Sequence, residues 1–292
     1  MNQPSIIHET FQLEAGHLSS GEPLRIRGDV RTVTQEEERS AVRKPVLLIS
    51  HGFKGFKDWG FFPYIASRFA EAGYYTVTYN FSCNGVNESD FDELDKFGLN
   101  TFSREQQDLD IVLKTLLEQR LPLSSEADTE RIYLLGHSRG GGGGIIFAAE
   151  HPEIKALVTW NGSAYADLFD EAFKAQVLEH GVGYVANART KQEMPIRAAF
   201  YDDLEANGHR FDIVHRLAEL SIPVLQLQGD QDSPRLREGF EALRIGAPRH
   251  KPTIIEGGNH TFGAVHPFQS TTPPLGEALR VTLQFLNDLN QK

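Results

Sequence analysis

Short apolar runs alternate with amphipathic segments along most of this chain. The apolar runs cover 45–50, 74–79, 132–135, 154–160, 223–228 and 253–255, and each has the length of a buried strand. Helical spacing of apolar residues covers 62–72, 103–119, 211–220, 236–243 and 276–289. Ser103 is the expected N-cap of the second helix. The alternation predicts an α/β fold, with a mostly parallel central sheet and helices on both faces.

Two stretches depart from this alternation. Residues 5–13 and 23–33 predict an antiparallel strand pair ahead of the parallel sheet, followed by a charged loop over 34–44. The second stretch, 161–220, is 60 residues long (220 − 161 + 1), whereas a helical crossover needs only about a dozen. We therefore predict a lid at 161–214, inserted between core segments 1–160 and 215–292. The lid is expected to contain an amphipathic helix over 166–179 and a hairpin within 181–197, and to be more mobile than the sheet.

Composition argues against some classes of partner and indicates a compartment. The 292 residues carry a net charge of −11, which argues against nucleic acid or an anionic membrane as a partner. Cys83 is the single cysteine, so the chain cannot form an internal disulfide. The first residues lack the pattern of a secretion signal, and no apolar run approaches the roughly 20 residues of a membrane span. These features predict a cytoplasmic protein, either a monomer or a homodimer.

The stretch around Ser138 carries the strongest candidate chemistry. The apolar run 132–135 is followed by Gly-His-Ser-Arg-Gly at 136–140, and a glycine run then leads into an apolar helical segment. A serine at a sharp strand-to-helix turn, with glycine two residues before and after it, is typical of a nucleophile elbow. Gly136 and Gly140 are expected because side chains there would collide with the neighbouring strand and helix. This pattern does not account for all five glycines of 140–144.

A second glycine-containing loop, residues 51–59, directly follows the predicted strand 45–50. Such a loop can turn a backbone N–H towards a nucleophile, so the N–H groups of Phe53 and Arg139 are candidates for an oxyanion hole. Lys54 and Lys57 are expected to be solvated. Aromatic and histidine side chains on this loop and beside the elbow are candidates to line a substrate pocket, and the residues proposed for it are His51, Gly52, Phe56, Trp59, His137 and Trp160.

An acid and a histidine follow two later strands. Asp232 comes just after the run 223–228, and His260 comes just after 253–255. In a parallel sheet, ligands bind beyond the carboxyl ends of the strands, where Ser138, Asp232 and His260 all fall. Asp230 and His266 are the rivals for the acid and the histidine. No histidine spacing indicates a metal site. A catalytic triad of serine, aspartate and histidine requires no metal or organic cofactor.

With these motifs, the chain resembles the α/β-hydrolase superfamily, and within it small bacterial esterases and dienelactone-hydrolase-like proteins. Dienelactone hydrolases proper use a cysteine nucleophile, whereas the elbow here carries Ser138. The resemblance implies a serine esterase that cleaves a small, partly apolar ester or thioester, with a lid that shapes the acyl pocket. The same fold also supports acyl transfer, perhydrolysis or peptide cleavage, and a non-catalytic ligand-binding homologue is a further alternative.

Overall fold

The structure, a computed structural model, describes residues 5–33 and 42–291. Its main sheet has eight strands in the order β1-β2-β4-β3-β5-β6-β9-β10. Strand β2 pairs antiparallel with β1 and with β4, and all other neighbours are parallel. The strands are β1 (Ile6–His17), β2 (Pro23–Val33), β3 (Lys44–Ser50), β4 (Tyr75–Asn80), β5 (Ala127–His137), β6 (Ile154–Trp160), β9 (Val224–Gly229) and β10 (Lys251–Ile255). The mostly parallel sheet predicted from the sequence is confirmed.

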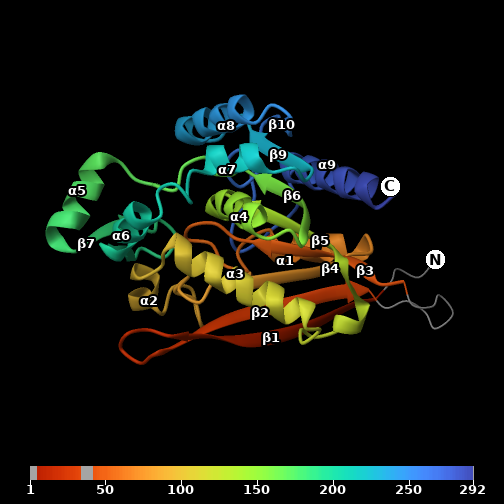
Figure 1. Cartoon of the computed structure of the whole chain (residues 1–292), viewed down its shortest axis with the longest axis horizontal. Coiled ribbons are helices and arrows are strands. Elements are labelled where there is room, and N and C mark those ends of the chain that lie inside the picture. Colours follow the sequence, from red (N-terminus) through yellow and green to blue (C-terminus); the bar gives the residue numbers. More distant parts are fainter. Residues whose placement is uncertain (1–4, 34–41, 292) are drawn as a thin grey trace.

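Helices cover both faces of this sheet (Figure 1). Apolar side chains of α1 (Phe62–Glu71) and α9 (Pro273–Asn290) form a core on one face. The core on the other face contains side chains of α3 (Phe102–Leu117), α4 (Arg139–Glu150), α7 (Ile213–Glu219) and α8 (Pro234–Gly246). In the described ranges, no helix has both the length and the apolar character of a membrane span.

Local differences from the predicted elements are small and have physical causes. The N-cap of α3 is Thr101 and not Ser103, because the Thr101 side chain accepts a hydrogen bond from the N–H of Arg104. Ser103 instead donates to a carboxylate of the lid. The predicted loop over 34–44 lies largely outside the described residues, since 34–41 are not described, and Lys44 already belongs to β3.

The segment predicted as a lid contains elements that lie outside the main sheet, at one end of the molecule (Figure 1). These are α5 (Glu171–His180), β7 (Val182–Ala186), β8 (Glu193–Arg197) and α6 (Ala199–Ala206). Strands β7 and β8 form the predicted hairpin. Asp203 on α6 accepts hydrogen bonds from the backbone and hydroxyl of Ser103, and Arg189 in the hairpin forms an ion pair of 2.6 Å with Asp90. The hairpin and α6 are therefore attached to the body of the protein.

We expect mobility in the lid to be concentrated in α5. Val177 is the one buried side chain of this helix, whereas α6 is held by the Asp203 contacts. Helices with few buried contacts open locally at low cost, and their amides exchange quickly. Hydrogen-exchange mass spectrometry should show faster exchange in 171–180 than in 199–206 or in β5. Equal protection of 171–180 and β5 would contradict a mobile lid.

The glycine run 140–144 is explained by close packing around the first turns of α4. A Cβ atom on Gly140 would lie 2.4 Å from the backbone oxygen of His51. A Cβ on Gly142 would lie 2.7 Å from both the backbone and hydroxyl oxygens of Ser163. Gly143 differs, because its nearest neighbour would be the side-chain nitrogen of Gln106 at 3.4 Å. Glycine is therefore a steric requirement at 140, 141 and 142, whereas a Cβ on Gly144 would meet only leucine side chains, at 3.2 and 3.3 Å, and Gly143 has the most room.

Alanine substitutions at two neighbouring glycines should have opposite effects. Gly143→Ala should raise the free energy of unfolding by up to about 1 kcal/mol, because alanine costs less conformational entropy in a helix. Gly142→Ala should lower it by about 1–3 kcal/mol through overpacking against Ser163. Urea denaturation of both variants measures the difference. If Gly143→Ala were as destabilising as Gly142→Ala, the steric explanation would be wrong.

Candidate active site

Ser138 lies at the turn between β5 and α4, as the elbow pattern predicts. Its backbone has φ +56° and ψ −123°, a region that residues other than glycine rarely adopt. The turn is held by the neighbouring chain: the N–H of Ser138 donates to the carbonyl of Trp160 at 2.9 Å, and its own carbonyl accepts from the N–H of Ser163 at 3.0 Å. These bonds keep the hydroxyl at the carboxyl end of the sheet.

Ser138, His260 and Asp232 form a continuous chain of hydrogen-bonding atoms. His260 Nε2 lies 3.0 Å from Ser138 Oγ, and His260 Nδ1 lies 3.0 Å from Asp232 Oδ2. Asp232 is buried, whereas the His260 side chain is 38% exposed. Burial alone would raise the pKa of Asp232, but contact with His260 and donation from the Ser233 N–H and the Gln228 amide hold this pKa below its ordinary value. The carboxylate is therefore ionised at neutral pH.

The structure separates both predicted residues from their rivals. Within the described residues, His260 bonds to Asp232 and not to Asp230, whose Oδ1 is buried without a hydrogen-bond partner. His266 points away from Ser138: its Nδ1 accepts the N–H of Gly60 at 2.9 Å, and its ring stacks on Trp59. Asp232 and His260, and not these rivals, therefore lie in one hydrogen-bonded chain with Ser138.

The loop after β3 approaches Ser138 closely. A Cβ atom on Gly52 would lie 2.8 Å from the Cβ of Ser138, so only glycine allows this approach. Phe53 follows directly, and no turn or loop hydrogen bond of the described chain uses its N–H. Arg139 is the first residue of α4, where N–H groups have no acceptor within the helix. Two backbone donors beside the serine are therefore free of helix and turn hydrogen bonds.

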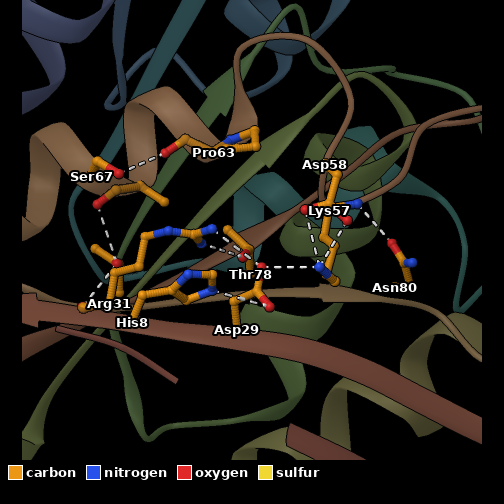
Figure 2. Close-up of polar contacts among 11 residues, drawn as sticks. His8, Asp29, Arg31, Lys57, Asp58, Pro63, Ser67, Thr78 and Asn80 are labelled. Atoms are coloured by element: carbon orange, nitrogen blue, oxygen red, sulfur yellow. Dashed lines mark hydrogen bonds and ion pairs between the residues drawn. The ribbon is translucent and has the colours of Figure 1, made fainter. Parts of the chain in front are cut away.

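Lys57 fixes this loop to the sheet (Figure 2). Its ammonium group lies 3.0 Å from the buried carboxylate of Asp29 on β2, and its backbone N–H donates to Asn80 Oδ1 at 2.6 Å. The expectation that Lys57 is solvated is therefore wrong, because only 16% of its side chain is exposed. Arg31 and His8 also contact Asp29, so this carboxylate lies among three cationic or protonatable groups (Figure 2).

Two cavities, of about 330 and 310 Å³, flank the site. Phe53, Lys54 and His260 line both of them. Ser138 opens into the larger cavity, whose apolar wall includes Leu168 and Phe169 of the lid. Three predicted pocket residues line the smaller cavity, namely Gly52, Trp59 and His137. The turn of the lid hairpin also lines it, through Asn187, Ala188 and Arg189. Leu168 and Phe169 belong to the amphipathic segment of the lid, but spacing alone could not place that segment over Ser138.

Three of the predicted pocket residues line neither cavity. His51 is 4% exposed and packs edge-on against Phe81, and Phe56 is 2% exposed between Phe91 and His266. Trp160 is fully buried, and its indole N–H donates to Thr282 on α9. Their placement in the pocket was wrong because these side chains face the cores and not the open end of the sheet.

Three buried groups give an expected pH dependence of stability. Burial lowers the pKa of His51 to about 4 and of His137 to about 3, and it raises the pKa of Asp108 to about 6. As the pH falls below about 6.5, the unfolded histidines bind protons that the folded ones do not, so stability decreases. Asp108 has the opposite effect on stability: between about pH 6 and 4 its carboxyl is protonated only in the folded form, so it stabilises the fold as the pH falls.

The destabilising effect of the two histidines should exceed the stabilising effect of the one carboxyl. The free energy of unfolding should therefore decrease when the pH is lowered from 7 to 4.5. Urea denaturation at the two pH values measures this loss. Asp108→Asn should make the loss larger, since it removes the opposing group. A protein that is equally stable at both pH values, or more stable at pH 4.5, would contradict these shifts.

The order and direction of the strands, with helices on both faces, are those of the α/β-hydrolase fold. A family model described as the dienelactone hydrolase family matches residues 30–181, just over half of the chain. The chain therefore belongs to this family.

Several known proteins are similar to this chain at low sequence identity. Two proteins of Escherichia coli, each described as an uncharacterized 31.7 kDa protein in the traX-finO intergenic region, are 28% identical over 127 residues. That match spans 44% of this chain and 40% of each relative. Among solved structures, Est1E from Butyrivibrio proteoclasticus has a TM-score of 0.65 at 16% identity, over 96% of this chain and 99% of its own. The α/β hydrolase GrgF from Penicillium sp. sh18 has a TM-score of 0.69 at 17% identity, over 96% and 98%. At these identities the structures share the fold.

Proposed function

We propose that the protein is a serine hydrolase that cleaves the carboxylic ester, or thioester, of a small and partly apolar substrate. The observation that carries this proposal is the unbroken chain from Asp232 through His260 to Ser138, with 3.0 Å at each step. The two flanking cavities support a substrate with two halves of modest size, one on each side of the reacting bond.

In the first half of the reaction, Ser138 Oγ attacks the ester carbonyl while His260 Nε2 takes the hydroxyl proton. Asp232 orients the imidazole and stabilises the imidazolium that forms. The backbone N–H groups of Phe53 and Arg139 donate to the oxyanion of the tetrahedral intermediate. His260 then returns the proton to the leaving alcohol or thiol, and the acyl group stays on Ser138.

The second half repeats these steps with water. His260 takes a proton from a water molecule, whose oxygen attacks the acyl carbonyl. The second tetrahedral intermediate collapses, the proton returns to Ser138 Oγ, and the carboxylic acid leaves. No step of this reaction needs a metal ion or an organic cofactor.

The kinetics of p-nitrophenyl acetate hydrolysis test this proposal. Stopped-flow measurement should give a burst of p-nitrophenol no larger than one equivalent of enzyme, and Ser138→Ala should give neither burst nor turnover above background. Matched oxygen and sulfur esters then separate esterase from thioesterase activity. Added alcohols that capture most of the acyl group would indicate an acyltransferase. Full turnover by Ser138→Ala would overturn the proposal.

A further inference from the structure

Asn161 lies between the three loops that carry the proposed triad. It follows the last residue of β6, and its side chain is fully buried. Its backbone N–H donates to the carbonyl of Leu227 on β9 at 2.8 Å, while the preceding residue accepts the N–H of Ser138. Its φ is +47°, a left-handed conformation that asparagine tolerates better than most residues. The position therefore joins the serine elbow to the strand that leads to Asp232.

Both the oxygen and the nitrogen of the Asn161 side-chain amide form hydrogen bonds to the backbone. Oδ1 accepts the N–H of Gly229, the last residue of β9, at 2.7 Å. Nδ2 donates to the carbonyls of Asn259 and His260, at 3.2 and 2.9 Å. An amide is the side chain that accepts at one end and donates twice at the other, so this set of partners specifies asparagine. One buried side chain thus connects the acid loop to the histidine itself.

The backbone hydrogen bonds between the acid loop and the histidine loop end before His260. The N–H of Asp230 donates to Ile255, and the N–H of Gln231 donates to Gly258. The carbonyl of His260 accepts from Asn161 and, at 2.8 Å, from Nε2 of His137. Because a carbonyl oxygen can only accept, His137 Nε2 carries the proton of this imidazole, which stays neutral since burial lowers its pKa to about 3. The backbone of His260 is thereby held from both the elbow and the β6–β9 side.

On the basis of the proposed function, we propose that Asn161 is a positioning residue that fixes His260 relative to Ser138 and Asp232. The imidazole must keep hydrogen-bond contact with a hydroxyl on one side and a carboxylate on the other. A displacement of about 1 Å can cost about 100-fold in rate. Because the His260 ring is 38% exposed, packing around the ring constrains it only partly, and the hydrogen bonds to its backbone supply the rest.

Two substitutions at Asn161 test this role. Asn161→Gly removes the side chain and suits the positive φ, and Asn161→Asp keeps the shape and the acceptor for Gly229 but loses both donors. Both variants should lower kcat for p-nitrophenyl acetate by about 10- to 100-fold, with KM within about threefold of wild type. The rate of fluorophosphonate labelling should fall in parallel, because it also depends on His260.

The controls separate positioning from a loss of stability. Leu116→Ala removes a buried side chain of α3 outside the two cavities, and it should lower the stability without changing kcat. Wild-type kcat in a folded Asn161→Gly or Asn161→Asp protein would overturn the positioning role. Failure of both variants to fold would also overturn it, because the role would then be structural. Failure of the proposed function is distinct, since wild type itself would then show no turnover dependent on Ser138.

Discussion

Replacing His260 with glutamine is expected to reduce kcat/KM for p-nitrophenyl acetate by about 10⁴- to 10⁶-fold. Its imidazole lies 3.0 Å from both Ser138 Oγ and Asp232 Oδ2, and glutamine cannot take and return a proton near neutral pH. Without this base the serine hydroxyl remains protonated and is a poor nucleophile. Steady-state kinetics and labelling rates measured on the same preparation give the size of the loss.

His266→Gln is the matched control for this substitution. His266 is six residues away, and it binds the N–H of Gly60 and stacks on Trp59, but it does not contact Ser138. Its turnover should remain within about tenfold of wild type, since the glutamine amide can still accept a hydrogen bond. A larger loss in His266→Gln than in His260→Gln would show that the histidine had been assigned wrongly.

Asp232→Asn should reduce kcat by about 10⁴-fold while KM changes little. The amide cannot stabilise the imidazolium, and its NH₂ group favours the wrong tautomer of His260. Asp230→Asn provides a control of identical chemistry two residues away, because His260 bonds to Asp232 and the buried Oδ1 of Asp230 has no hydrogen-bond partner in the described residues. It should retain turnover within about tenfold of wild type.

The comparison of these two asparagine variants is informative because both positions follow β9. Equal losses in both would mean that the loop, and not the carboxylate of Asp232, is what the reaction needs. A large loss in Asp230→Asn alone would reverse the assignment of the acid. Thermal denaturation of both variants excludes global unfolding as the cause.

The fold was predictable from the sequence because burial on both faces leaves continuous apolar runs in the parallel strands. The run at 154–160 is an example, since it became β6 with the predicted bounds. The cap of α3 was placed wrongly because Thr101 and Ser103 are both good N-cap residues. Asp203, which binds Ser103, is 100 residues away, and local sequence could not reveal this contact.

Candidate site residues could be predicted where a reactive side chain directly follows a predicted strand. The direction of a side chain could not be predicted where it depends on packing against distant residues. Ser138, Asp232 and His260 each follow a strand in the order that the elbow requires, and the structure brings them together. His51 and Trp160 also lie at strand ends, but their side chains turn into the cores. Asn161 escaped prediction because its importance depends on contacts with residues 68 to 99 positions away.

Intact-mass spectrometry after fluorophosphonate treatment is the most direct test of whether Ser138 is an activated nucleophile. We expect a single adduct on the wild-type protein and none on Ser138→Ala, with slow labelling of His260→Gln. An equal adduct on wild type and Ser138→Ala would place the reactive group elsewhere in the chain. No adduct on wild type, at reagent concentrations that label a known serine hydrolase, would contradict the claim.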